Sequence, residues 1–318
     1  MRHFLRDDDL HADEQAAVIA AAARMAGDPG AALGSVTPAA IGLFFEKPSL
    51  RTRVSTEIAA ARIGAQPVQL RPDELQLARG ESVSDTARVL GGYLRVLMAR
   101  VFDHGLLEAL ATEDSLSVVN GLSDRFHPLQ TLADLLTLHQ EWNGSLSGRT
   151  LVYVGDGNNV ATSLLLGAPM RAMRVIVACP PGYAPDPEIV EVAAGRASAY
   201  GGEAIVTDDA VAAVSEADAL YADVWTSMGD EGEEVARRAA LAPYQLNSDL
   251  LGAAPADSVV LHCLPAHRGE EITADVIDGD RSRVFPQAHN RLPSAASLFL
   301  FLCDPGRVFA LGAGSDGA

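Results

Sequence analysis

The sequence has little of what a disulfide framework, a nucleic-acid partner or a membrane span needs. Among 318 residues there are only three cysteines, Cys179, Cys263 and Cys303, too few and too scattered for a disulfide framework or a zinc cluster. The 24 basic residues face 42 acidic ones, and a net charge of -18 argues against a nucleic-acid or anionic-membrane partner. No apolar run approaches the roughly 20 residues that span a bilayer, so we expect no membrane contact.

Three further absences narrow the class of protein. The chain turns acidic at 7–9, where an exported protein would carry an apolar signal segment, so we expect a cytoplasmic location. There is no Gly-x-Gly-x-x-Gly dinucleotide turn and no cluster of metal ligands, so we expect no organic cofactor and no metal. What the chain does have is length, because 318 residues favour two domains of roughly 150 residues each.

Apolar runs of strand length alternate with helical patterns along the whole chain. Such continuous apolar strands predict an α/β fold of two domains, each a parallel sheet flanked by helices and joined by bridging helices. The predicted strands are 41–45, 67–70, 96–101, 116–119, 150–154, 175–178, 204–206, 219–222 and 259–262.

A Gly/Ser-rich connection at 143–148 marks the boundary between the domains. It predicts a first domain over 1–140 and a second over 141–290, with a helix from about 127 bridging them. A last helix, over about 291–305, is expected to pack back on the first domain. The Gly-rich tail from 306 to 318 is expected to be disordered.

The most polar loop is S-L-R-T-R at 49–53, which follows the strand 41–45 and opens a helix. Ser49 is the expected N-cap of that helix, and Val54, Ile58 and Ala61 have the spacing of one buried face. Unpaired N–H groups at a helix start, with serine, threonine and arginine donors beside them, are suited to bind a phosphate. Taken alone, the motif fits a capped surface helix with solvated arginines equally well.

Other polar segments also follow predicted strands, where ligands bind in open parallel sheets. By themselves they have structural readings: a histidine helix cap, a solvated arginine, a tight turn with an asparagine cap, a glycine-containing loop and a small buried cysteine. In order they are Arg100, H-P-L-Q at 127–130, D-G-N-N at 156–159, D-V-W-T-S-M-G at 223–229 and H-C-L-P at 262–265.

Five of these segments, in this order, resemble the motifs of the aspartate/ornithine carbamoyltransferase family. The family usually has Ser-Thr-Arg-Thr-Arg in the first loop, where this chain has Leu50, and often Glu-Ala-Glu-Asn-Arg where this chain has Q-A-H-N-R at 287–291. The resemblance implies a carbamoyl-phosphate site made of Ser49, Leu50, Arg51, Thr52, Gln76, Arg100, His127, Gln130, Cys263, Leu264 and Arg291. Of these, Arg51, Thr52, Arg100, His127 and Cys263 are the implied catalytic residues.

The resemblance also implies an ornithine site, made of Asn159, Asp223, Ser227 and Met228. The loop at 223–229 and the H-C-L-P segment resemble the ornithine branch of the family, and aspartate enzymes lack the loop's signature. With no paired base evident nearby, Cys263 is expected to orient the substrate amine together with Asp223 rather than to attack covalently.

The implied reaction moves the carbamoyl group of carbamoyl phosphate to the side-chain amine of L-ornithine, giving L-citrulline and phosphate, in arginine metabolism. The resemblance further implies a homotrimer with shared active sites, in which Gln76 reaches the neighbouring subunit's site. Two alternatives stay open: a carbamoyltransferase for another amine, such as putrescine or an acylated ornithine, and a weakly active regulatory paralogue.

Overall fold

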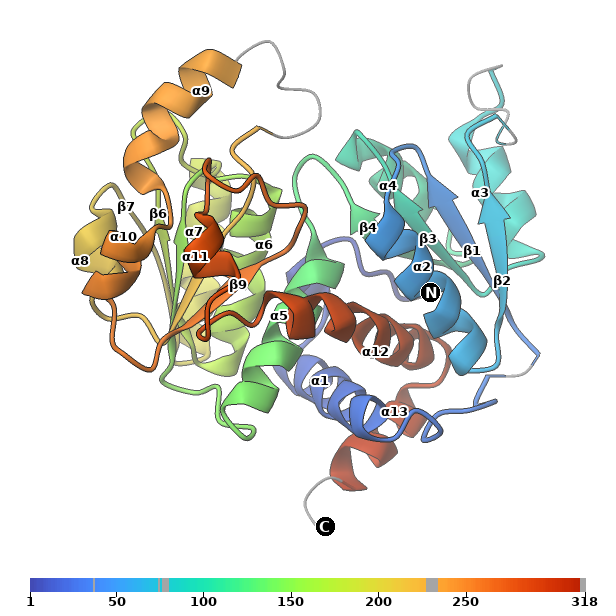
Figure 1. Ribbon diagram of the computed structural model, residues 1–318. Helices are drawn as coiled ribbons and strands as arrows, with labels where there is room; N and C mark the ends of the chain where they lie inside the picture. The colour runs from blue at the N-terminus through green and yellow to red at the C-terminus, as the bar shows by residue number, and fades with distance from the viewer. Residues whose placement is uncertain (37, 74, 76–79, 227–233, 315–318) are drawn as a thin grey trace. The chain divides into compact units, whose positions relative to one another are not determined.

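The structure is a computed structural model and describes all residues except 37, 74, 76–79, 227–233 and 315–318. The predicted site residues Gln76, Ser227 and Met228 therefore lie outside the described residues. The chain forms two compact units (Figure 1). Unit 1 comprises residues 1–136 and 289–318, and unit 2 comprises residues 137–288.

Unit 1 contains a four-stranded parallel sheet in the order β2-β1-β3-β4. Its strands are β1 (Ala40–Phe45), β2 (Gln66–Leu70), β3 (Val96–Arg100) and β4 (Ser117–Leu122). Successive side chains of a strand point to opposite faces, so both faces of this apolar sheet need cover. Ile41, Leu43 and Phe45 join one hydrophobic cluster and Phe44 joins the other.

Helices cover the two faces of this sheet. The helices that contribute to unit 1 are α1 (Ala12–Gly27), α2 (Leu50–Arg62), α3 (Val83–Gly91), α4 (His104–Ala111), α5 (Pro128–Glu141), α12 (Val284–Cys303) and α13 (Pro305–Ala313), with the short 3-10 helix η1 (Asp7–Asp9). Residues of α1, α2, α5, α12 and α13 pack on the face of Ile41, whereas α3 and α4 pack on the face of Phe44.

Unit 2 contains a five-stranded parallel sheet in the order β7-β6-β5-β8-β9. Its strands are β5 (Thr150–Val154), β6 (Arg174–Ala178), β7 (Glu203–Thr207), β8 (Ala219–Ala222) and β9 (Val259–His262). Its helices are α6 (Asn159–Gly167), α7 (Pro187–Ala199), α8 (Ala210–Val214), α9 (Glu234–Leu241), α10 (Ser248–Ala253) and α11 (Ala274–Ile277), with the 3-10 helices η3 (Ala168–Arg171) and η5 (Ala242–Tyr244).

The predicted fold class is confirmed, because each unit is a parallel sheet flanked by helices. All nine predicted strands form, and the largest difference is at β4, which continues to Leu122 rather than ending at residue 119. The boundary between the units falls within α5 and within α12, so these two helices are the bridging ones. None of the helices in the described part of the chain is long and apolar enough to cross a membrane.

Two predictions about the C-terminal region are wrong. The last long helix begins at Val284 and contains Pro293, although proline was taken to start it. The segment after residue 305 is not disordered through 313, because it forms α13. Val308 is fully buried in the unit 1 core, and Gly312 approaches the backbone of α1 closely, so packing orders a segment whose composition suggested disorder.

The predicted buried face of α2 is also wrong. Val54 and Ile58 are 46% and 45% exposed, and Ala61 is exposed as well. The buried residues of this helix are instead the small ones, Thr52, Thr56, Ala59 and Ala60. Small side chains let α2 approach the sheet, and the apolar stripe faces outward.

Each sheet has one place where the direction of strand addition reverses. In unit 1 this switch lies between β1 and β3, and in unit 2 it lies between β5 and β8. Loops after the two strands at a switch diverge to opposite faces and leave a crevice at the carboxyl ends of the strands. The S-L-R-T-R loop and Arg100 follow the first pair of strands, and the D-G-N-N turn and Asp223 follow the second.

Candidate active site

The start of α2 is organised as its sequence predicts. Ser49 is the N-cap, and its hydroxyl accepts a hydrogen bond from the backbone N–H of Thr52 at 3.3 Å. Leu50, the first helical residue, directs a 77% exposed side chain to solvent. Thr52, one turn on, is completely buried. The loop therefore turns one hydroxyl residue inward and holds it at a helix N-terminus.

Thr52 is where two arginines of unit 1 meet. Its hydroxyl oxygen accepts from Nη2 of Arg291 at 2.7 Å and, more weakly, from Nη1 of Arg100 at 3.5 Å. A guanidinium can only donate, so the hydroxyl acts as acceptor toward both and keeps its own proton for a further acceptor. Residues from β3, α2 and α12 are thereby joined at one buried oxygen.

Gln130 is held in one orientation by partners on both sides. Its amide oxygen accepts from Nη1 of Arg291 at 2.6 Å, and its amide nitrogen donates to the Asp134 carboxylate at 2.8 Å. Flipping the amide would place N–H against the guanidinium and oxygen against the carboxylate. Gln130 and Asp134 are both completely buried, four residues apart on α5. The sequence reading missed Asp134, although an i, i+4 partner could have been sought.

His127 is an uncharged member of this cluster. Burial, together with Arg291, Arg100 and Arg51, holds the pKa of His127 well below its ordinary value. The imidazole is therefore neutral at neutral pH, and the positive charge of the cluster resides on the arginines. The structure brings Arg51, Arg100, His127 and Arg291 together, as the motifs predict. Three guanidiniums beside a neutral ring suit a phosphate attached to a carbonyl.

The loop between β1 and α2 is fixed against the segment that follows β3. The Glu46 carboxylate accepts from the backbone N–H of Phe102 at 2.9 Å, and the ammonium of Lys47 lies 4.2 Å from the centre of the Phe102 ring. Lys47 is the only lysine in the sequence and is buried, yet the sequence reading did not consider it. A cavity of about 390 Å³ opens beside this loop, lined by residues 45–50 and Arg53.

In unit 2, Asp223 gathers two of the predicted neighbours of a substrate amine. Its carboxylate accepts from the Cys263 thiol at 2.8 Å and from the side-chain amide of Asn158 at 2.8 Å. Asn158 also caps α6, because its oxygen accepts from the N–H groups of residues 160 and 161. Asn159, the predicted ligand, is the first residue of α6. The cap residue before it thus has a second partner that the sequence reading missed.

The H-C-L-P segment is held by contacts of its own. Leu264 has a left-handed backbone with φ of 57°, which costs energy for a leucine, and its N–H donates to Nδ1 of His262 at 2.9 Å. The other ring nitrogen, Nε2, then carries the proton and donates to the buried Glu271 carboxylate at 3.1 Å. Both ring nitrogens of His262 are engaged, so the ring supports the backbone that places Cys263.

Gln287 replaces the first glutamate of the family's usual Glu-Ala-Glu-Asn-Arg. It is completely buried, accepts from the backbone N–H of His262 at 2.9 Å and donates to the Tyr221 hydroxyl at 3.0 Å. A glutamine can accept and donate at once, as both contacts require. The departure from the family pattern is therefore accommodated by hydrogen bonding within unit 2.

The chain matches known proteins over nearly its whole length. Residues 2–140 match the family model described as aspartate/ornithine carbamoyltransferase, carbamoyl-P binding domain, and residues 147–302 match the one described as Asp/Orn binding domain. The chain belongs to the aspartate/ornithine carbamoyltransferase family. The resemblance inferred from the motifs is thereby confirmed.

Individual relatives in this carbamoyltransferase family agree. An ornithine carbamoyltransferase of Acidothermus cellulolyticus is 51% identical over 304 residues, 96% of this chain and 97% of that protein. The solved ornithine carbamoyltransferase of Pyrococcus furiosus has a TM-score of 0.89 and 42% identity, covering 94% of this chain and 96% of that one. The anabolic ornithine carbamoyltransferase of Campylobacter jejuni has a TM-score of 0.88 and 32% identity, covering 95% of this chain and 99% of that one.

Possible metal ligands do come together in this carbamoyltransferase. Among the described residues, Asp223, His262 and Cys263 place ligand atoms within 4.8 Å of one another, and His267, Glu270 and Glu271 do the same. The sequence search for ligand clusters did not find the first group, because Asp223 comes from another strand. Its side chains already bond to one another and to Glu271. A reaction that needs no metal stays a prediction.

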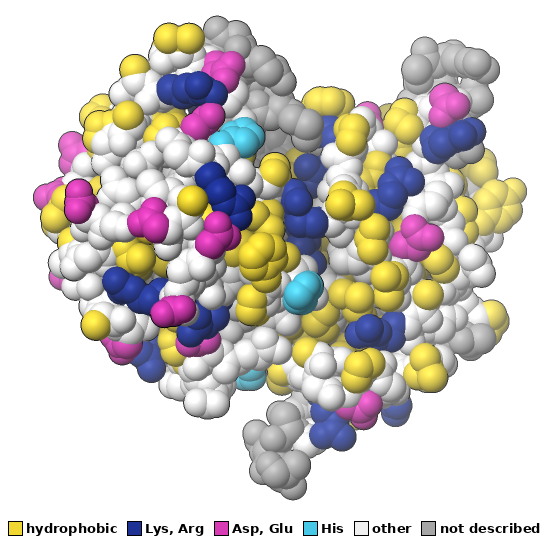
Figure 2. Space-filling model, in the orientation of Figure 1, with side chains coloured by type: hydrophobic (Ala, Val, Ile, Leu, Met, Phe, Trp, Pro, Cys, Tyr) yellow, Lys and Arg dark blue, Asp and Glu magenta, His cyan; other side chains and the backbone are white. Residues whose placement is uncertain are grey.

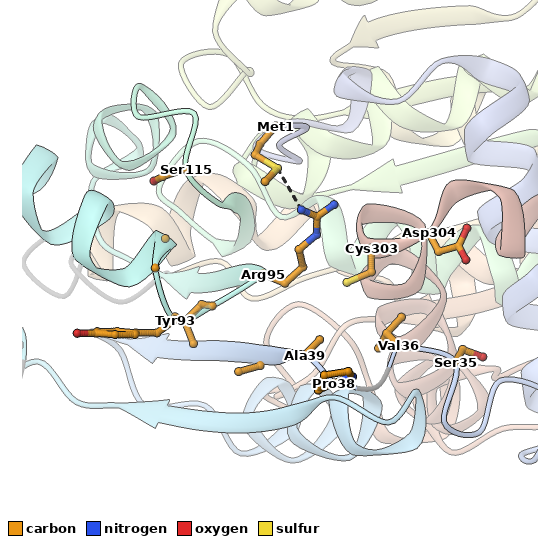
Figure 3. A pocket seen from close by; sticks show the side chains of 14 residues that line it. Met1, Ser35, Val36, Pro38, Ala39, Tyr93, Arg95, Ser115, Cys303 and Asp304 are labelled. Carbon is orange, nitrogen blue, oxygen red and sulfur yellow. Dashed lines mark hydrogen bonds between the residues drawn. The ribbon is translucent and has the colours of Figure 1, made fainter.

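A larger cavity of unit 1 lies at the other edge of the sheet. It has a volume of about 490 Å³ and lies at the amino-terminal ends of β1 and β3, away from Thr52 and Arg100. Figure 3 shows Arg95 pointing toward Met1, whose sulfur accepts from the guanidinium at 3.5 Å, with Cys303 and Asp304 nearby. No predicted site residue is among the residues that line it, so this cavity is not the candidate site.

The low pKa of His127 predicts how stability depends on pH. Below the ordinary histidine pKa of 6.5 the unfolded chain takes up a proton that folded His127 refuses, so the free energy of unfolding falls as pH falls through that region. In His127→Asn this slope should be smaller, by up to about 1.4 kcal/mol per pH unit. Denaturant unfolding between pH 5 and 7 measures it, and exposed His11→Asn is the control. An unchanged slope in His127→Asn would contradict a neutral buried His127.

Proposed function

We propose that this protein is an ornithine carbamoyltransferase, which makes L-citrulline and phosphate from carbamoyl phosphate and L-ornithine. The observation that carries the proposal is the buried Thr52 hydroxyl, which accepts from Arg291 and Arg100 beside a neutral His127. The names of the relatives, all ornithine carbamoyltransferases over nearly full length, support the same reaction.

The residues of unit 1 act on carbamoyl phosphate. Arg51, Arg100 and the N-terminus of α2, with Ser49 and Leu50, hold the phosphate through charge and backbone N–H groups. Thr52, Arg100 and His127 donate to the carbonyl oxygen, which becomes negative as the tetrahedral intermediate forms. The Gln130 oxygen, fixed by Asp134 and Arg291, faces the carbamoyl nitrogen as acceptor. Gln76 of a neighbouring subunit, with Cys263 and Leu264, completes the proposed set.

The residues of unit 2 act on ornithine. Asp223 supplies a carboxylate to the substrate's ammonium and, with Cys263, orients the δ-amine, while Asn159 holds the amino-acid end. Ser227 and Met228 are proposed to contact the aliphatic stem. The δ-amine, with an ordinary pKa of roughly 10 by analogy with lysine, must lose its proton before it attacks. A C–N bond then forms, the C–O bond to phosphate breaks, and phosphate takes the proton.

Several finer statements belong to the same proposal. The carbamoyl-phosphate domain is residues 1–140 with the helix after 290, and the ornithine domain is residues 141–290. The protein acts in the cytoplasm, in arginine biosynthesis, and needs no metal or organic cofactor.

We further propose that the protein is a homotrimer with shared active sites, and the outward stripe of α2 supports this. Leu50, Val54 and Ile58 lie four residues apart and are 77%, 46% and 45% exposed. Figure 2 shows hydrophobic side chains on the surface of unit 1 where α2 lies. Large apolar side chains aligned on one exposed helix face suit an interface between copies. The stripe begins in the phosphate loop, so a second copy seated there lies next to the site.

One assay tests the reaction. The protein is supplied with carbamoyl phosphate and, in turn, ornithine, putrescine, acetylornithine or aspartate, and phosphate release is followed. Release should be fastest with ornithine, and Arg51→Ala should lower it by at least about 100-fold, because a charged donor to the phosphate is lost. Arg62→Ala, at the other end of α2, is the control. Faster release with another amine, or none with ornithine, would refute the assignment.

The interface proposal has its own test. Placing a charge on the stripe, with Val54→Glu and Ile58→Glu together, should convert trimers to monomers, because burying an unpaired carboxylate costs several kcal/mol. Light scattering after size exclusion gives the mass, and circular dichroism checks the fold. Val211→Glu on α8, where the side chain is 63% exposed, is the matched control. A double variant that keeps the wild-type mass would show that α2 is not the interface.

A further inference from the structure

We propose that Arg237 is a positioning residue for acceptor binding, because it ties together the two backbone segments whose side chains meet at Asp223. The inference rests on the proposed transfer to ornithine and names a residue that the motifs do not mark. Arg237 lies on α9, 14 residues beyond Asp223, outside every segment that resembles the family motifs.

Arg237 is buried, with 9% of its surface exposed, and its guanidinium is well satisfied. Nε donates to the backbone oxygen of Trp225 at 2.7 Å, and Nη2 forms an ion pair with the Asp156 carboxylate. The guanidinium carbon lies 5.2 Å from the centre of the Tyr183 ring. A buried guanidinium is costly unless its donors are engaged, so these contacts define one arrangement of the three loops.

The two polar contacts of Arg237 flank the hydrogen bond that orients Asp223. Trp225 is two residues after Asp223, and Asp156 is two residues before Asn158. Between them, the side-chain amide of Asn158 donates to the Asp223 carboxylate at 2.8 Å. Arg237 therefore holds the segment that carries Asp223 and the turn that carries Asn158 at a set separation. Without it, the distance across that hydrogen bond is no longer fixed from this side.

The turn that Arg237 grips has little freedom of its own. The N–H of Asn158 donates to the Asp156 oxygen at 2.8 Å, and the N–H of Gly157 donates to the Tyr183 oxygen at 2.8 Å. A Cβ on Gly157 would lie 2.5 Å from that same oxygen, so only glycine fits against the next loop. A pull on the Asp156 side chain is thus passed to Asn158 rather than absorbed by the turn.

Charge points the same way. Asp156 and Asp223 are both buried, at 7% and 5% exposure, and both contribute to raising the pKa of Tyr153, whose ring lies on β5. Arg237 is the cation paired with Asp156. Removing it leaves two buried carboxylates near one another, which favours a different arrangement of Asp223.

The adjacent residue offers a matched control. Arg238 is 49% exposed and pairs with Glu234 and Glu270 at the surface. Arg237→Gln and Arg238→Gln therefore remove the same charge one residue apart. We expect Arg237→Gln to raise the KM for ornithine roughly tenfold or more, since a misplacement of about 1 Å is that costly. The KM for carbamoyl phosphate should stay within about twofold, and Arg238→Gln should match the wild type in both.

A conservative variant separates positioning from mere stability. Lysine keeps the charge but cannot reach Asp156 and Trp225 with two fixed donors, so Arg237→Lys should recover part of the ornithine KM. Arg237→Gln combined with Asp156→Asn should be no worse than either change alone, because the pair acts as one unit. An unchanged ornithine KM in Arg237→Gln, or equal losses for both substrates with a lowered melting temperature, would overturn the inference.

Hydrogen exchange tests the positioning without any substrate. The N–H groups of Val160 and Ala161 are capped by Asn158, so they should exchange faster in Arg237→Gln than in Arg238→Gln. Equal exchange in the two variants would overturn the inference whatever the enzyme transfers. A wild-type protein that fails to use ornithine would instead refute the proposed function, and the exchange result would still decide the role of Arg237.

Discussion

The Thr52 hydroxyl accepts from Arg291 and Arg100, and the chemistry of unit 1 depends on this buried contact. A protein with a net charge of -18 has to concentrate positive charge locally if it is to bind a phosphate. It does so with arginines rather than lysines, since the chain has a single lysine. Guanidiniums present several donors in a fixed plane, so one group can contact Thr52 and Gln130 together, as Arg291 does.

The two units carry opposite charge at their candidate sites. In unit 1, Arg51, Arg100 and Arg291 depress the pKa of buried His127. In unit 2, Asp223 and Asp156 help burial to raise the pKa of Tyr153. The first environment suits an anion and the second suits an ammonium, which are the charges of the two proposed substrates. Opposite local potentials thus accompany a fold in which both units use the same parallel-sheet architecture.

Much of this could be read from the sequence. Apolar runs located all nine strands, and strand-end motifs located Thr52, Arg100, His127, Asp223 and Cys263. These succeeded because parallel sheets make both signals local: a strand is a short continuous apolar run, and its ligand residues follow it directly. The cap role of Ser49 was likewise a local signal.

What failed depended on partners distant in the chain. The stripe of Val54 and Ile58 was assigned to the core because the periodicity of a helix gives its apolar face but not what that face meets. The tail of α13 seemed too glycine-rich to order, yet it packs on α1 from the other end of the chain. Arg237 carried no signal, because its partners Asp156 and Trp225 belong to other loops.

The account depends most on a neutral His127 held among arginines where carbamoyl phosphate binds. Nitrogen NMR of labelled histidine reports the protonation of this ring directly, in the free protein and with carbamoyl phosphate added. The ring should stay neutral from about pH 5.5 to 8, below and above the ordinary histidine pKa, and its resonances should move when the ligand is added. A ring that titrates near 6.5 and ignores carbamoyl phosphate would contradict the account.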